Sequence, residues 1–332
     1  MTTKMHDAMN SLLSAVQAAD SILLFSHVSP DGDTLGSALA LKMLLQRQKK
    51  QVALVLDGVV PEHLFFLPDL YAFRSPEAVW EETEGKSFLA IAVDVASLER
   101  LGCGKALFEK AAVTAQIDHH HSNPGYAEIN LIDGDAPATA VIIDRVRDAM
   151  GLPLEREETV CLYTALATDT GNFVYESINS EAFLLMSRLM EAGLPLAKYS
   201  QLLFRRKERD FLVSLGKALP TLTYFCKGQV AGMQLRRDKL KDGESANTEG
   251  IVNYAIDAAG VKLAYFLYET EAGDIKCNLR ALSPFRVDEV AALFGGGGHY
   301  LAAGCTLEGS LEDAVKKVQE ALQKAWEETV HG

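Results

Sequence analysis

The chain has 332 residues, of which 48% are hydrophobic and 23% are charged, and its net charge is −13. This composition is typical of a folded protein and excludes a disordered or fibrous chain, while the length predicts two domains. Because proteins bind long nucleic acids through many Lys and Arg contacts to phosphates, the acidic balance argues against a long duplex as partner. A small anionic substrate is compatible with the negative net charge, because bound metal ions can reverse the sign of the charge at the site.

The same composition predicts a cytoplasmic protein. No apolar run approaches the roughly 20 residues that span a bilayer, and the polar opening segment lacks the apolar core of a signal peptide. The five cysteines are scattered and lack CxxC spacing, as expected of reduced thiols. We therefore expect neither membrane association nor a structural zinc site.

The first half alternates short apolar runs with helical patterns. Strands are predicted at 22–25, 52–56, 89–93, 113–117 and 129–132. Most of these runs are continuously apolar, which is typical of a buried parallel sheet. Helices are predicted at 34–48, 138–150 and 157–168. The order predicts an α/β domain, a parallel sheet with helices on both faces.

The second half begins with a helical, charge-rich stretch over 196–219, which we interpret as a connector with a solvated face. Beyond it the patterns predict a smaller α+β domain, with strands at 229–235, 262–268 and 275–282, helices at 249–259, 287–294 and 311–329, and a glycine run at 295–298. We expect domains at 1–190 and 221–332, joined by a helical linker at 191–220.

One imidazole and two carboxylates follow the first predicted strand. His27, Asp31 and Asp33 lie at the carboxyl end of that strand, where ligand crevices of parallel sheets form. Pro30 and Gly32 permit a tight loop that can turn the three side chains toward one point. Imidazole and carboxylate ligands suit Mn²⁺ and similar ions. A helix cap would explain Asp33 alone, but not the other two.

Further acids and histidines also lie at the ends of elements. Asp94 ends the strand at 89–93, and alone it would be interpreted as a turn former. The strand at 113–117 is followed by Asp118, His119, His120 and His121, a cluster that favours metal chemistry over packing. Asp169 ends a helix, where the macrodipole disfavours an acid unless a cation is near. Two metal ions, which together catalyse phosphoryl displacement, would find enough ligands in His27, Asp31, Asp33, Asp94, His119 and Asp169.

The glycine run offers a candidate phosphate site. Its backbone N–H groups could hold an anion, although a hinge is equally compatible with four glycines before His299. Arg280, on the strand before the run, could contact a phosphate in a bidentate way. An exposed strand arginine without such a role is the alternative.

These motifs resemble the DHH phosphoesterases, specifically the DHH plus DHHA1 type represented by NrnA-like oligoribonuclease/pAp phosphatases. The matching segments follow the order of that family: HVSPDGDTLGS, AVDVAS, IDHHHSN, ATDTGNF, EGIVN, CNLRA and GGGGHYLAAG. Two features depart from its pattern: a third histidine, His121, which receives no role, and the details of the segment from Arg280 to Arg286, which leave the role of Arg286 open.

The resemblance implies a pair of Mn²⁺ ions in the first domain. His27 and Asp31 would bind one ion, Asp33, His119 and Asp169 the other, and Asp94 would bridge them. Asp94, Asp118 and His120 would form the catalytic centre. His120 would face the scissile phosphate, and Asp118 would orient the histidines. The far phosphate or nucleotide would be held by Arg280, Gly296, Gly297, Gly298 and His299, so that cleavage needs the two domains closed over a cleft.

The resemblance and the charge favour hydrolysis of very short RNA, with dephosphorylation of pAp to AMP as a second activity. Short RNA oligonucleotides and small nucleotides are thus the expected partners, and a homodimer is a candidate assembly. One alternative is a phosphodiesterase for cyclic or linear dinucleotides, which uses the same two modules. Another is a nucleotide-binding regulatory protein without turnover. RecJ-like exonucleases usually add further domains, and family II pyrophosphatases resemble the first domain but lack a second domain of the GGGH type.

Overall fold

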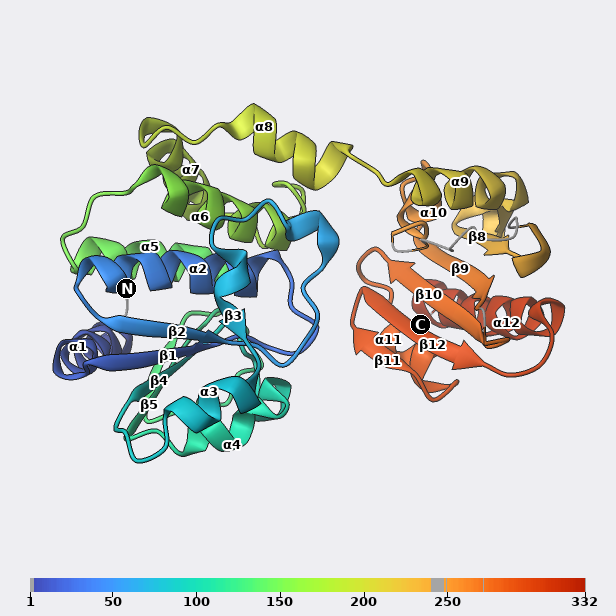
Figure 1. Cartoon of the computed structure of the whole chain (residues 1–332). Coiled ribbons are helices and arrows are strands. Elements are labelled where there is room, and N and C mark those ends of the chain that lie inside the picture. Colours follow the sequence, from blue (N-terminus) through green and yellow to red (C-terminus); the bar gives the residue numbers. More distant parts are fainter. Residues whose placement is uncertain (1–2, 240–247, 249, 271, 332) are drawn as a thin grey trace. The chain divides into compact units, whose positions relative to one another are not determined.

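A computed structural model of the chain describes residues 3–239, 248, 250–270 and 272–331 (Figure 1). The chain divides into two compact units, Met1–Arg206 and Lys207–Gly332. Each unit contains one six-stranded sheet. Among the described helices, none has the length and apolar character that crossing a membrane requires.

The sheet of the first unit is parallel throughout, as predicted, in the order β3-β2-β1-β4-β5-β6. Its strands are β1 (Ser21–Phe25), β2 (Gln51–Val55), β3 (Phe73–Arg74), β4 (Leu89–Val93), β5 (Val113–Asp118) and β6 (Ile129–Ile132). The strand order reverses between β1 and β4, which are neighbours in the sheet although β2 and β3 separate them in the chain. A ligand crevice is expected outside the carboxyl ends of strands at such a reversal.

Helices cover both faces of this sheet, which confirms the predicted α/β class (Figure 1). Ile22 and Leu24 of β1 face one core, and Leu23 and Phe25 face the other. Because both faces are covered, the strand is apolar at all four of its buried positions, 22–25. The first core also contains residues of α1 (Thr3–Ala18), α2 (Gly32–Arg47), α5 (Thr139–Ala149), α6 (Arg156–Asp169) and α7 (Ser180–Glu191). The second core contains residues of α3 (Pro76–Glu82) and α4 (Gly104–Glu109).

Two glycines bring α2 and α6 close together. A Cβ atom on Gly36 would lie 2.4 Å from the backbone oxygen of Cys161, and one on Gly32 would lie 2.3 Å from Oγ1 of Thr168. Only a residue without a side chain permits this approach. The helix pair therefore holds the start of α2 beside the end of α6.

The stretch predicted as a helical connector is divided between separate helices. The chain passes through α8 (Leu196–Ser200) and a π-helical turn (Gln201–Arg205), and α9 (Arg209–Ala218) begins after a break. Leu203 packs in the core of the first unit, whereas Phe211 and Leu215 pack in the second unit. The two halves of the stretch thus belong to different units, which explains the break between them.

The second unit is a smaller α+β domain, as predicted. Its mixed sheet has the order β11-β12-β10-β9-β8-β7 and consists of β7 (Thr223–Phe225), β8 (Val230–Leu235), β9 (Leu263–Glu269), β10 (Ile275–Ala281), β11 (Gly297–His299) and β12 (Ala302–Leu307). One face packs against α11 (Asp288–Ala292) and α12 (Leu311–His331), and the other against α9 and α10 (Asn253–Ile256). The helix predicted at 249–259 is reduced to α10, and Glu249, the residue at its predicted start, lies outside the described residues.

We expect replacement of Gly36 by alanine to destabilise the first unit by about 1–3 kcal/mol, the usual cost of overpacking a tight contact. The added methyl group would clash with a backbone oxygen of α6, and a backbone atom cannot move aside as a flexible side chain can. Urea unfolding followed by circular dichroism measures the change. Gln46→Ala, at an exposed position of the same helix, is the matched control and should change stability by less than about 0.5 kcal/mol. Equal effects of both variants would contradict the close helix contact.

Candidate metal centre

All six residues predicted to bind metal come together at the carboxyl edge of the first sheet. Three overlapping groups place their ligand atoms within 4.8 Å of one another: His27, Asp31 and Asp94; Asp33, His119 and Asp169; and Asp94, His119 and His120. The contributing segments follow β1, β4 and β5 and include the adjoining ends of α2 and α6. The strand order and the close packing of these two helices thus create the cluster.

Asp31 and Asp94 are fixed by the backbone. Asp31, and not Asp33 as the sequence suggested, caps α2: its Oδ1 accepts hydrogen bonds from the N–H groups of Asp33 (3.0 Å) and Thr34 (3.1 Å). Asp94 follows β4 in a left-handed conformation with a φ of 60°, and its N–H donates to the oxygen of Ile117 at 2.9 Å. Asp tolerates this conformation better than most residues. The turn directs the chain away from the sheet immediately after the last strand residue.

The first turn of α5 binds the carboxylate of Asp33. Its Oδ2 accepts a hydrogen bond from the N–H of Thr139 (2.7 Å), and its Oδ1 accepts from the N–H of Ala140 (3.2 Å) and the hydroxyl of Ser37 (2.8 Å). Helix N-termini favour anions. The hydroxyl of Thr139 also donates to Oδ1 of Asp94 at 3.0 Å. Thr139 was not among the predicted site residues; its place at the start of a predicted helix was the one available signal.

The carboxylate of Asp94 lies between two halves of the cluster. Its Oδ2 is 3.8 Å from Nε2 of His27, and its Oδ1 is 3.6 Å from Nε2 of His119. On the first side, Nε2 of His27 is also 3.6 Å from Oδ2 of Asp31. On the second side, Nε2 of His119 is 3.2 Å from Oδ2 of Asp169. Each oxygen of Asp94 therefore faces one imidazole and its companion acid.

Hydrogen bonds to carbonyl groups set the tautomers of both histidines. Nδ1 of His27 is 2.7 Å from the oxygen of Val28, and Nδ1 of His119 is 3.1 Å from the oxygen of Ala136. Because a carbonyl only accepts, Nδ1 must carry the proton in each pair. In the neutral imidazole, Nε2 then presents its lone pair to the cluster, as a metal ligand does.

A second carboxylate–imidazole pair lies beside the cluster. Nδ1 of His120 is 2.7 Å from Oδ1 of Asp118, whose other oxygen accepts a hydrogen bond from the side chain of Asn123. Burial opposes ionisation of both partners, but their mutual interaction outweighs it, so the pKa of Asp118 is lowered and the pKa of His120 is raised. The sequence motif IDHHHSN contains Asn123, but its role was not predicted.

The buried acids repel one another. The side chains of Asp33 and Asp94 are only 1% and 2% exposed, and burial together with the neighbouring carboxylates raises the pKa of Asp94 well above its usual range. Burial and the charge of Asp33 raise the pKa of Asp169 to about 7. For Asp31, the interaction with His27 outweighs burial and lowers the pKa. A cation would relieve this repulsion, and imidazole and carboxylate together match divalent ions such as Mn²⁺.

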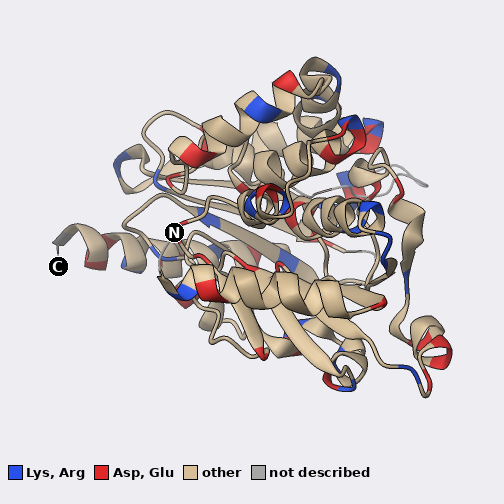
Figure 2. Cartoon of the chain, turned by 90° about the vertical axis from the view of Figure 1, so that its left-hand side faces the viewer, with Lys and Arg blue, Asp and Glu red and all other residues tan. Residues whose placement is uncertain are grey.

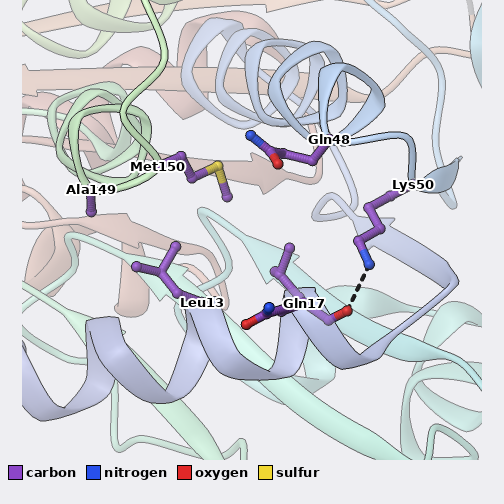
Figure 3. Close-up of a pocket in the computed structure, with 7 residues that line it drawn as sticks. Leu13, Gln17, Gln48, Lys50, Ala149 and Met150 are labelled. Carbon is purple, nitrogen blue, oxygen red and sulfur yellow. Dashed lines mark hydrogen bonds between the residues drawn. The ribbon is translucent and has the colours of Figure 1, made fainter.

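His121 and a separate pocket lie outside this cluster. His121 is exposed, and its ring packs against Gly134. The pocket in Figure 3 is located near the C-terminal end of α2, the opposite end from Asp33, and Lys50 donates a hydrogen bond there to the oxygen of Gln17 at 2.8 Å. None of the residues that line it belongs to the predicted site.

In the second unit, the glycine run is part of a hairpin. Gly297, Gly298 and His299 form β11 and pair with β12, opposite Gly304, Ala303 and Ala302 respectively. A Cβ atom on Gly296 would lie 2.2 Å from the oxygen of Gly304, so the strands approach as closely as glycine allows. No strand was predicted here from the sequence, because glycine is normally depleted in strands. Gly296 and Gly304 help to line a pocket, together with Tyr268, Lys276 and Asn278.

The two arginines singled out in this unit differ in their surroundings. Arg280 lies on β10, on the side opposite the core residues Leu279 and Ala281, and donates to the oxygen of Leu279 at 2.9 Å. Arg286 contacts two carboxylates, those of Asp288 at 2.6 Å and Glu289 at 3.0 Å. Arg286 thus pairs with acids of the adjoining helix α11.

The sequence matches two domain families. Residues 21–166 match the DHH family, N-terminal domain, and residues 229–327 match the DHHA1 domain. Both matches agree with the resemblance inferred from the motifs, and each falls within one structural unit.

Individual relatives match nearly the whole chain. The bifunctional oligoribonuclease and PAP phosphatase NrnA of Thermus thermophilus is 29% identical over 91% of this chain and 89% of its own length. The protein of the same name from Bacillus subtilis is 24% identical over 89% of this chain and 92% of its own. The crystal structure of an exopolyphosphatase-related protein from Bacteroides fragilis has a TM-score of 0.87 at 26% identity and covers 96% of both chains. The chain belongs to the DHH phosphoesterase family and combines a DHH N-terminal domain with a DHHA1 domain.

Proposed function

We propose that the chain is a two-metal phosphoesterase that uses Mn²⁺ to hydrolyse short oligoribonucleotides, and that it also converts pAp to AMP and phosphate. The observation that carries the proposal is the position of the Asp94 carboxylate, which presents one oxygen to His27 and the other to His119. Two similar relatives are named oligoribonuclease and PAP phosphatase, which supports this choice of substrates.

The two halves of the cluster would each hold one ion. His27 and Asp31 would bind the first, Asp33, His119 and Asp169 the second, and Asp94 would bind both. A bound pair of divalent ions supplies a water of lowered pKa and stabilises the charge that develops on a phosphoryl group. The measured distances fit this division, because each half joins an imidazole nitrogen to the carboxylates nearest it.

His120 is the group that would act on the substrate directly. Its Nδ1 is held by Asp118, so that the ring presents Nε2 away from the pair, and the side chain is 26% exposed. The raised pKa of His120 favours the imidazolium form, which could donate a hydrogen bond to the scissile phosphate. Asp118 would act on the substrate only by orienting and charging this ring.

The DHHA1 unit would bind the rest of the substrate. Arg280 would contact a phosphate, and Gly296, Gly297, Gly298 and His299 would border the nucleotide. This unit would thus restrict cleavage to small molecules with a second phosphate to bind. Acidic and basic residues are interspersed over the chain (Figure 2), and the net charge of −13 favours a short substrate over a long duplex. The free cysteines agree with a cytoplasmic location.

Replacement of Asp94 by asparagine should abolish turnover on every phosphoester, because the amide cannot offer two anionic oxygens to two ions. We expect a loss of at least about 100-fold in kcat/KM, together with weaker Mn²⁺ binding in calorimetry. Asp20→Asn, an exposed acid that precedes β1, is the matched control and should leave both unchanged. Normal turnover by the Asp94 variant would refute the two-metal proposal.

A panel of substrates separates the roles of the two units. Protein loaded with Mn²⁺ should hydrolyse pAp and short RNA, and His299→Ala should reduce these activities far more than hydrolysis of a generic phosphodiester such as bis-p-nitrophenyl phosphate. An equal loss on both kinds of substrate would contradict a binding role confined to the second unit. Preferential hydrolysis of cyclic di-AMP or pGpG would favour the dinucleotide alternative. Tight binding without any hydrolysis would indicate a regulatory protein.

The raised pKa of Asp169 predicts how stability depends on pH without metal. Its carboxyl group is neutral in the folded protein but ionised in the unfolded chain between pH 3.8 and about 7, so folding stability should fall as the pH rises through this window. Asp169→Asn removes this contribution, and the metal-free variant should therefore be more stable than the parent at pH 8, with a smaller difference at pH 4. Thermal unfolding in EDTA measures both. Added Mn²⁺ should stabilise the parent more than the variant.

A further inference from the structure

One arginine lies directly beside the acidic cluster. Arg100 belongs to a short 3₁₀ helix (Leu98–Leu101) that follows β4, and its side chain is partly exposed. Its Nη2 atom is 3.1 Å from Nδ1 of His27, and its backbone oxygen accepts a hydrogen bond from the N–H of Val28 at 2.8 Å. The segment after β4 therefore places a fixed positive charge next to the first half of the cluster.

Arg100 forms no ion pair with an acid of the described residues, because none of their carboxylate oxygens lies within 4.0 Å of its guanidinium nitrogens. Its side chain contacts Nδ1 of His27 instead. Other arginines of this unit do pair with acids, as Arg74 does with Glu82 and Arg145 with Asp133. An arginine that stays unpaired beside several carboxylates keeps its hydrogen-bond donors for another anion.

The contact with His27 is a poor hydrogen bond for the N–H donors of Arg100. In the tautomer that presents Nε2 to the cluster, Nδ1 donates its proton to Val28, 2.7 Å away, and has no lone pair for Arg100. The guanidinium group thus lies beside His27 without a good acceptor there.

We propose that Arg100 is a substrate-binding residue of the first unit, which contacts the phosphate group held at the metal centre. The proposal rests on the proposed function only in that the ligand is a phosphate ester. A guanidinium group matches phosphate geometry and can contact two oxygens at once. It would add a fixed positive charge at the non-bridging oxygens, beside the hydrogen bond proposed for His120.

A purely structural role makes the opposite prediction for metal binding. If Arg100 served only to hold His27 and its loop in place, its loss would weaken the binding of Mn²⁺. If Arg100 binds phosphate, its removal takes a repelling charge away from a cation site. Mn²⁺ should then bind as tightly as before or more tightly, while anions bind less well. The two roles are distinguished by the sign of the change.

The test uses Arg100→Gln in the full chain, with Arg74→Gln as the matched control that removes the same charge from an exposed ion pair. Calorimetry measures the affinity for Mn²⁺, and then the affinity of the loaded protein for inorganic phosphate. We expect unchanged or tighter Mn²⁺ binding by Arg100→Gln and roughly tenfold or greater weakening of phosphate binding, the usual effect of losing a charge-assisted hydrogen bond. The control should resemble the parent in both.

Unchanged phosphate affinity, or weakened Mn²⁺ binding, would overturn the proposal. Arg100→Lys keeps the charge and should recover part of the phosphate affinity, and it replaces the glutamine variant if that variant does not fold. With pAp as substrate, the KM of Arg100→Gln should rise by a similar factor. If the parent hydrolyses no phosphoester, the proposed function fails, but the phosphate titration still decides the role of Arg100.

Discussion

The repulsion between buried carboxylates at the end of the first sheet is the constraint on which the rest of this unit depends. Asp33 and Asp94 are almost fully buried, and each has a carboxylate oxygen within 4.8 Å of another acid, Asp169 and Asp31 respectively. Burial of an anion is costly unless it is paired or hydrogen-bonded. Backbone N–H groups and histidines satisfy part of this need, but the raised pKa values of Asp94 and Asp169 show that they do not satisfy all of it. The unit is therefore built to receive positive charge.

The strand order explains how residues far apart in the sequence meet in one cluster. β1 lies between β2 and β4, so the segment that contains His27 is a direct neighbour of the segment that contains Asp94. β5 is next to β4 and adds the histidines that follow it. α2 and α6 then bring Asp33 and Asp169 together, because their glycine contacts allow the helices to touch. Sheet topology and one helix pair are enough to define the site.

Much of this arrangement could be predicted from the sequence. Continuous apolar runs identified the parallel strands, and the acids and histidines immediately after them identified the edge where a ligand would bind. The partners that fix those side chains could not be predicted in the same way. Thr139 binds Asp33 across more than a hundred residues, and only the folded chain shows that the N-terminus of α5 points at α2. β11 was also missed, because a run of glycines does not indicate a strand.

The ligand positions are held by contacts that do not require a metal. Asp31 caps its own helix, Asp33 receives the N–H groups of α5, and His119 donates to the oxygen of Ala136. These bonds hold the carboxylates close together, so their repulsion is not relieved by movement of the side chains and instead raises the pKa values of Asp94 and Asp169. A cation that enters such a site gains the full attraction without a large rearrangement of its ligands. The same rigidity explains why a charge placed nearby, such as that of Arg100, acts on an anionic ligand rather than collapsing onto the acids.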